Sequence, residues 1–138
     1  MVYQDSIHFD TTGHRDMRDL TPHVQRIVDD SGIRFGIVQV FNIGSTGAIT
    51  AIEYEPGLKQ DFPAILDRLF PMDSDWEHHK TWGDHNGGSH LQASTLGMDF
   101  SCPLSDGRLN VGTWQQVIHL ACDDKPRRRE VVVTVIGE

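Results

Sequence analysis

The sequence predicts an α+β domain, because its apolar residues change period along the chain. Apolar residues recur at helical spacing twice before residue 70. After residue 98, β-branched and aromatic runs follow one another with turn residues between them. Helices and strands that are segregated in this way are typical of α+β folds. We therefore expect two helices in the N-terminal half and an antiparallel meander towards the end of the chain.

The first helix is expected to begin at Thr21, as an N-cap, with Pro22 in the first helical position, where its missing N–H costs nothing. Gly32 is expected to stop it. Its apolar stripe consists of Val24, Ile27 and Val28.

The second helix is predicted over Phe62–Leu69, where apolar residues again recur at helical spacing. Asp61 is its expected cap, and Pro63 is expected to confine the regular part to these residues.

The predicted strands are rich in β-branched and aromatic residues. Ser105-Asp106-Gly107 is a hairpin signal, and the segment 123–126 (DDKP) is expected to turn the chain into the last strand. The six strands are Ile33–Phe41, Ala48–Tyr54, Phe100–Leu104, Arg108–Thr113, Trp114–Ala121 and Arg127–Ile136.

Length and charge limit the classes of protein that this chain can represent. Its 138 residues are expected to form one domain, residues 1–138. The net charge of −8 argues against nucleic acid as a partner, because such surfaces are normally basic. No apolar run approaches the roughly 20 residues that span a bilayer, so no membrane partner is expected.

The start of the chain lacks the features of a secretory signal, and the two cysteines show no metal-finger spacing. Cys102 and Cys122 are interpreted as buried, reduced thiols rather than a disulfide or a nucleophile. These observations predict a cytoplasmic protein.

The segment Trp82–Ser94 (WGDHNGGSHLQAS) is the strongest candidate for a site. Two adjacent glycines, Gly87 and Gly88, are expected to adopt a positive φ and to let a ligand approach the backbone. The residues around them, Asp84, His85, Asn86, Ser89 and His90, supply carboxylate, amide, hydroxyl and imidazole groups that suit a metal or a phosphate.

Four motifs in this order and spacing resemble the YjbQ-type family, whose members are described as secondary thiamine-phosphate synthases. They are GSTGAITAIEYEPG, WGDHNGGSHLQASTLG, DGRLNVGTWQQV and KPRRREVVVTVIGE, and the resemblance covers nearly the whole chain. It implies a compact mixed or antiparallel β-sandwich or barrel-like sheet and a homotrimer. It also implies weak thiamine-phosphate synthase activity. The late strands carry apolar residues on both faces, and two short helices are not expected to bury both of them. This observation also favours an oligomer.

The chain departs from the family pattern at two positions. Gly44 stands where many relatives carry the histidine of HTT or HTS, and Gly88 stands where many carry the first histidine of GHSH. His85 is a candidate substitute, three positions away. A three-histidine zinc site is therefore not expected, and a weakly held hard cation such as Mg²⁺, or an anion alone, is the better hypothesis.

Thiamine-phosphate synthesis expels pyrophosphate from a carbon centre, so cations on the leaving group are the main requirement. We expect Glu53, Asp84 and His90 to form the catalytic and metal-binding set, with His90 also a candidate proton donor. A phosphorylated small ligand would then contact Asn86, Ser89, Trp114, Arg127 and Arg129, the two arginines as phosphate clamps. All of these residues are expected to converge at one rim of the sheet.

Structural roles remain open for the same residues. Asp84 and His90 could brace the turn by hydrogen-bonding each other, and Glu53 could be a solvated strand end. His78 and His79 could be surface residues, and Trp114 a core or interface aromatic. Accordingly the function is either a low-turnover transferase or hydrolase, a non-catalytic phosphate-binding trimer, or a purely structural protein. The last of these leaves the glycine segment unexplained.

Overall fold

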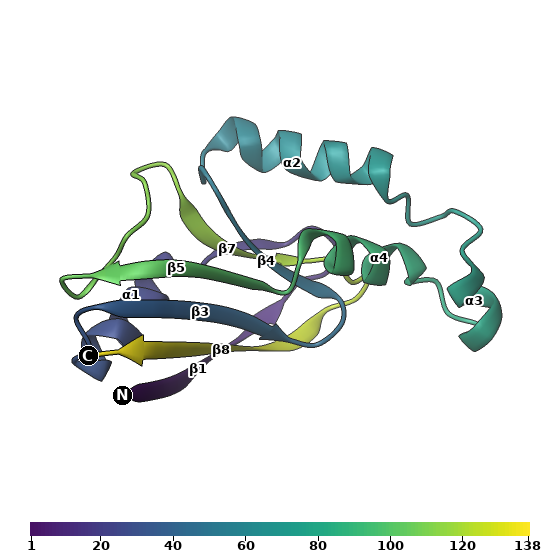
Figure 1. Cartoon of the computed structure of the whole chain (residues 1–138). Coiled ribbons are helices and arrows are strands. Elements are labelled where there is room, and N and C mark those ends of the chain that lie inside the picture. Colours follow the sequence, from purple (N-terminus) through teal and green to yellow (C-terminus); the bar gives the residue numbers. More distant parts are fainter.

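The computed structural model describes residues 1–138 and contains two antiparallel sheets. Figure 1 shows the larger sheet, which curls around one face of the molecule. Its strand order is β1 (Val2–Thr11), β8 (Arg127–Gly137), β3 (Gly36–Ile43), β5 (Asp99–Ser105) and β6 (Arg108–Leu109). The smaller sheet has the order β2 (Met17–Asp19), β7 (Gln116–Ala121) and β4 (Gly47–Ile52).

The main core lies between α1 (Thr21–Ser31) and the inward faces of both sheets. The apolar stripe of α1 is fully buried, as its helical spacing predicts. From the larger sheet, Val131, Val133 and Val135 alternate inward along β8. This core fixes β8, and with it the arginines at its start.

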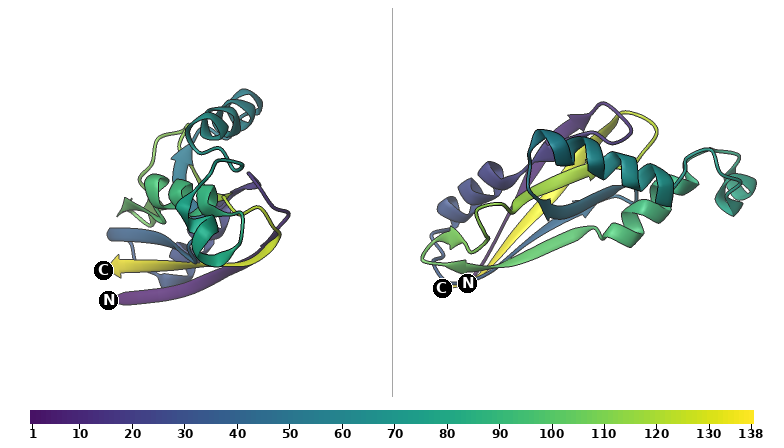
Figure 2. Two further views of the ribbon diagram at one scale, coloured as in Figure 1. Left: turned by 90° about the vertical axis from the view of Figure 1, so that its right-hand side faces the viewer. Right: turned by 90° about the horizontal axis from the view of Figure 1, so that it is seen from above.

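Three further helices follow β4: α2 (Pro56–Leu69), α3 (Glu77–Trp82) and α4 (Gly87–Leu96). The views in Figure 2 show α2 and α4 on the side of the smaller sheet that faces away from α1. A second core joins Leu66 of α2 and Ala93 of α4 to Ala48 and Leu120 of that sheet. Strand β7 is therefore covered on both faces within one chain.

The α+β class, the first two helices and the hairpin are confirmed. Gly32 ends α1 in a left-handed conformation, with φ of 70°. In the β5–β6 hairpin, Asp106 and Gly107 both have positive φ, as a two-residue type I′ turn requires.

Several predicted boundaries were wrong. Helix α1 is preceded by Leu20 as its cap rather than by Thr21. Helix α2 begins at Pro56 instead of Phe62, because the Glu55 carboxylate accepts hydrogen bonds from the Gly57 and Leu58 N–H groups. Pro63 is accommodated inside this helix.

Only strands follow the glycine segment, as predicted, but elements before it and within it were missed. The segment itself folds as helix α4, and α3, β1 and β2 were not predicted. Strand β6 stops at Leu109, and β7 starts at Gln116 rather than Trp114. Strands β7 and β8 belong to different sheets, so the chain crosses between sheets at residues 122–126 instead of forming a hairpin. No helix is long and apolar enough to cross a membrane.

Candidate functional site

Three segments distant in sequence line an open cavity of about 520 Å³. His14 comes from the turn after β1, and Asp124 comes from the connection between β7 and β8. The remaining lining residues lie between α2 and α4: Met72, Asp73, Ser74, His79 and His85. The cavity therefore combines three imidazoles, two carboxylates and a hydroxyl group in a space that a small ligand could fill.

His79 and His85 are held by contacts at the start of α4. The ring nitrogen Nε2 of His79 accepts a hydrogen bond from the Gly87 N–H at 3.0 Å. The ring of His85 meets that of His79 edge to face, with centroids 5.5 Å apart. Because Nε2 of His79 is an acceptor, a neutral His79 carries its proton on Nδ1.

The two glycines serve close packing rather than an unusual backbone conformation. Neither Gly87 nor Gly88 has a positive φ, so that prediction was wrong. A Cβ atom on Gly87 would lie 2.8 Å from the Trp76 Cβ and 3.1 Å from the His79 Nε2. On Gly88 it would lie 3.2 Å from the Met72 sulfur. Glycine thus lets α4 begin directly against the segment that carries the histidines.

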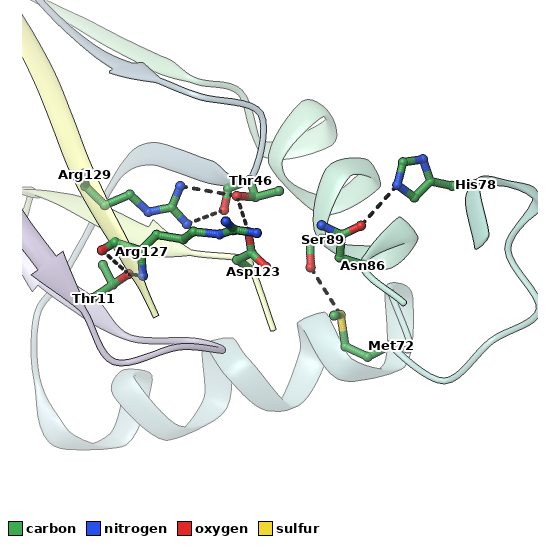
Figure 3. Close-up of polar contacts among 9 residues, drawn as sticks. All are labelled: Thr11, Thr46, Met72, His78, Asn86, Ser89, Asp123, Arg127 and Arg129. Carbon is green, nitrogen blue, oxygen red and sulfur yellow. Dashed lines mark hydrogen bonds and ion pairs between the residues drawn. The ribbon is translucent and has the colours of Figure 1, made fainter. Parts of the chain in front are cut away.

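A second polar cluster surrounds His78, on the other side of the α3–α4 connection. Its Nε2 lies 3.1 Å from Asp84 Oδ1 and 3.1 Å from Asn86 Oδ1, and its ring centroid is 4.7 Å from that of His90. Figure 3 shows the contact with Asn86. Of the residues predicted around the glycines, Asp84, Asn86 and His90 do converge, and they do so on His78.

Ser89 connects this region to the cavity wall. It is fully buried, and its hydroxyl donates a long contact of 3.7 Å to the sulfur of Met72, which lines the cavity (Figure 3). Ser89 therefore lies behind the wall rather than in the open space.

Glu53 and Trp114 lie elsewhere. Glu53 follows β4 and precedes α2, whereas His90 lies beyond the other end of α2, which at 14 residues spans about 21 Å. Figure 1 shows β4 entering α2 at the end remote from α3. Trp114 is 69% exposed, in the connection before β7. Glu53 therefore does not converge with His90 within one chain, because the two lie towards opposite ends of α2, and Trp114 is not among the residues that line the cavities beside His79 and His90.

The two arginines lie in a buried polar network beside Thr46 (Figure 3). Arg129 is buried and donates to the hydroxyl of Thr46 at 3.2 Å and to its carbonyl at 3.1 Å. Arg127 donates to Asp123 Oδ2 at 2.8 Å, and the Thr46 hydroxyl donates to the same oxygen at 2.9 Å. Arg129 is thus occupied by its own chain, while the half-exposed Arg127 lies nearer the solvent.

The electrostatics of this network follow from burial and hydrogen bonding. Burial raises the pKa of Asp123, but hydrogen bonds with Asp124, Arg127 and Thr46 outweigh it and hold that pKa at about 2. The hydrogen bond with Asp123, together with burial, raises the pKa of Asp124. The cavity is therefore lined by the more easily protonated member of this carboxylate pair.

Two buried groups nearby are held neutral. Burial, together with the charges of Arg129 and Arg18, lowers the pKa of His119 to about 3. Burial raises the pKa of the Cys122 thiol to about 12, and Cys102 is also buried with a raised pKa. Both cysteines are free thiols, as predicted. Neither group faces the cavity.

Comparison with known proteins agrees with the four sequence motifs. The family described as UPF0047 protein YjbQ-like matches residues 5–138. The chain belongs to the YjbQ family. A UPF0047 protein from Methanothermobacter thermautotrophicus is 34% identical over 137 residues, covering 99% of this chain and 94% of the relative.

Two solved structures extend the comparison to the YjbQ fold. A YbjQ-like protein of unknown function from Sulfolobus solfataricus superimposes with a TM-score of 0.95 at 34% identity, over 100% of this chain and 99% of that one. An uncharacterised YjbQ/UPF0047 protein from Clostridium acetobutylicum gives 0.87 at 30% identity, over 96% and 99%. The family resemblance is confirmed over the full chain.

The cavity residues of this YjbQ protein were largely missed by sequence reasoning. His14 follows a strand that was not predicted, and Asp124 was interpreted only as part of a turn. His79 was weighed as a surface residue, and His85 only as a substitute ligand. The one sequence signal for them is the density of histidines: four of the eight lie between residues 78 and 90.

The predicted metal ligands do not fit a cation as a set. Glu53 is remote from Asp84 and His90, and no three His, Cys, Asp or Glu side chains are grouped so as to hold a metal ion. No chemical step is therefore derived through a metal held by that set.

Proposed function

We propose that this YjbQ protein binds a phosphorylated or pyrophosphorylated small molecule in the 520 Å³ cavity. The observation that carries the proposal is the meeting of His14, from the turn after β1, with His79 and His85, from the segment between α2 and α4, at one cavity. Imidazole N–H groups donate hydrogen bonds to phosphate oxygens, and His79 can do so through Nδ1, because its Nε2 accepts from the Gly87 N–H. The volume lies within the roughly 300–1,000 Å³ of small-molecule sites.

The charges on the cavity wall support an anionic ligand more than the count of acidic residues suggests. Asp124 is the carboxylate whose pKa is raised, so a bound phosphate would favour its protonated, hydrogen-bond-donating form. Arg127, three residues after Asp124, is half-exposed and forms an ion pair with Asp123, which neutralises the charge of that carboxylate. Asp73 is the remaining acidic group that a phosphate would meet.

The transfer reaction that we propose is of the thiamine-phosphate synthase type, with low turnover. The thiazole ring nitrogen attacks the methylene carbon of a pyrimidine pyrophosphate and forms a C–N bond. The C–O bond breaks, and its electron pair leaves with pyrophosphate. The histidines would bind the leaving group and stabilise its developing charge, so no covalent nucleophile is required.

A direct binding test uses inorganic pyrophosphate and thiamine phosphate in isothermal titration calorimetry. We expect His14→Ala and His85→Ala each to weaken binding at least fivefold. The matched control is His23→Ala, on the exposed side of α1 and remote from the cavity. Equal affinity in all three variants and the wild type would contradict the proposed site.

The non-catalytic alternative is distinguished by turnover. A synthase predicts formation of thiamine phosphate from the two precursors, with a rate that falls in His14→Ala and His85→Ala. A binding protein predicts that pyrophosphate binds with the same histidine dependence while no thiamine phosphate forms above the uncatalysed rate.

We also propose that the chain assembles as a homotrimer through the outer face of the larger sheet. Val2, Ile37 and Ile136 form an exposed cross-strand row there, since Ile136 pairs with both of the others. Phe41 continues the apolar surface along β3. Strand β7 is already covered by helices within one chain. The exposed apolar surface that an interface would bury therefore lies on the outer face of the larger sheet.

A further inference from the structure

We propose that His78, Asp84 and Asn86 form a binding site for a divalent transition-metal ion. The site does not rest on ligand binding in the cavity, and it differs from the predicted set because Glu53 and His90 are not its ligands. Its basis is the convergence of one nitrogen and two oxygen atoms. His78 Nε2 lies 3.1 Å from Asp84 Oδ1 and 3.1 Å from Asn86 Oδ1.

Hydrogen bonds among the His78, Asp84 and Asn86 side chains cannot satisfy all three of these atoms. Nε2 of His78 carries at most one proton, and its hydrogen bond goes to Asn86 Oδ1. The Oδ1 atom of Asp84 is shielded from solvent, although the Asp84 side chain as a whole is 41% exposed, and it lies at the same 3.1 Å from Nε2. The single proton of Nε2 cannot be directed at both oxygen atoms at once. A cation between the three atoms would serve all of them at once.

The spacing also suits metal coordination. Bonds of about 2.0–2.2 Å to nitrogen and oxygen place adjacent ligand atoms about 3 Å apart in octahedral coordination and about 3.4 Å apart in the tetrahedral coordination typical of zinc. The two observed separations, 3.1 Å each, match the octahedral value. The third ligand, Asn86, binds through an amide oxygen. The site therefore has only two ligands of the His, Cys, Asp and Glu types, which agrees with the absence of any group of three such side chains.

The local fold holds the three side chains in place. His78 lies on α3, and Gly83 ends that helix in a left-handed conformation, with φ of 70°, so that the chain returns with Asp84 and Asn86. The ring of His90 packs on that of His78 at 4.7 Å and limits its rotation. A second cavity of about 430 Å³, lined in part by His78 and His90, leaves room for water to complete the coordination.

The donor set indicates the class of ion. An imidazole nitrogen with two oxygens favours Mn²⁺, Co²⁺ or Zn²⁺, whereas Mg²⁺ and Ca²⁺ prefer oxygen ligands alone. We therefore expect Zn²⁺ and Co²⁺ to bind more tightly than Mg²⁺.

The test is calorimetric titration of the chelator-treated protein with Zn²⁺, together with the absorption spectrum of the Co²⁺ form. We expect one site per chain, and an affinity at least tenfold lower in His78→Ala and Asp84→Asn. His23→Ala should match the wild type. If His78→Ala and Asp84→Asn also match it, exposed histidines elsewhere bind the metal and the proposal is wrong.

Asn86→Asp separates coordination from bracing, and circular dichroism confirms that each variant is folded. A second carboxylate beside Asp84 should lower the melting temperature of the metal-free protein by repulsion. If Asn86 is a ligand, the same change should tighten Zn²⁺ binding severalfold. Unchanged or weaker Zn²⁺ binding in Asn86→Asp would show that residue 86 only braces the turn.

Discussion

The Gly87 N–H donates a hydrogen bond to the Nε2 atom of His79, so the first residue of α4 is tied to a cavity-lining histidine of α3. Helix α4 therefore cannot shift without moving the cavity wall. Trp76 reinforces the junction, because its indole N–H donates to the Pro71 carbonyl at 2.9 Å and its side chain packs on Gly87.

Gly87→Ala should destabilise the protein by about 1–3 kcal/mol, because the new Cβ would overlap the Trp76 side chain. The measurement is the free energy of unfolding in urea. Ser94→Ala, on the exposed face of the same helix, is the control and should change it by less than about 0.5 kcal/mol. If the two variants are equally stable, α4 has room for a Cβ at residue 87 beside Trp76, and the argument from close packing is wrong.

His119 should make the stability of the protein pH-dependent. It is held neutral in the fold, where its Nε2 contacts Asn42 Oδ1 at 3.0 Å, whereas the unfolded chain takes up a proton near its ordinary pKa of 6.5. Folding stability therefore falls as the pH drops from about 6.5 towards 3, by about 1.4 kcal/mol per pH unit once well below 6.5.

The comparison variant is His119→Gln, measured by urea unfolding at pH 7.5 and pH 4.5. We expect the wild type to lose about 2–3 kcal/mol more than the variant over this interval, since a pKa of about 3 leaves the folded imidazole neutral throughout. Parallel losses in the two proteins would show that His119 is protonated in the folded state.

Thr46→Val should cost about 1–3 kcal/mol of stability, because its hydroxyl donates to Asp123 and accepts from Arg129 inside the core. It should also raise the pKa of Asp123, so that acid unfolding begins at higher pH than in the wild type. Thr95→Val, exposed on α4, is the isosteric control. Equal acid-unfolding curves for both variants would mean that the interactions with Asp124 and Arg127 suffice to hold the carboxylate ionised.

Sedimentation at micromolar concentration should give a particle three times the 15.5 kDa mass of the chain. Ile37→Lys should shift it towards the monomer, because a charge would then lie in the exposed apolar row of the larger sheet. Gln39→Lys places the same charge two residues away on the same face of β3. It tests whether a charge on this face is by itself enough to shift the protein towards the monomer. A wild-type monomer would overturn the homotrimer.

The sequence predicted the elements whose signal is local. Helix α1 has an uninterrupted apolar stripe and a glycine stop, and the β5–β6 hairpin has the Asp-Gly pair that its turn requires. Strand β1 was missed because its outward face is mostly polar and, among its inward positions, only Ile7, Phe9 and Thr11 are buried. Its stability comes from pairing with β8, more than a hundred residues away.

Only the part of the site whose residues are close in sequence was predicted. Asp84, Asn86 and His90 are close in sequence, and they meet in the fold. Glu53 was expected beside them on the assumption that strand end and glycine segment share a rim, but α2 intervenes. Helix α4 itself was missed because two glycines are poor helix formers, and packing against Trp76 outweighs that propensity.

The central claim is that a phosphorylated ligand occupies the cavity between His14, His79 and Asp124. A crystal structure of the protein soaked with thiamine phosphate tests it most directly. We predict density for the phosphate within hydrogen-bonding distance of at least two of the imidazoles of His14, His79 and His85. Phosphate density bound elsewhere on the chain, with the cavity holding only water, would contradict the account.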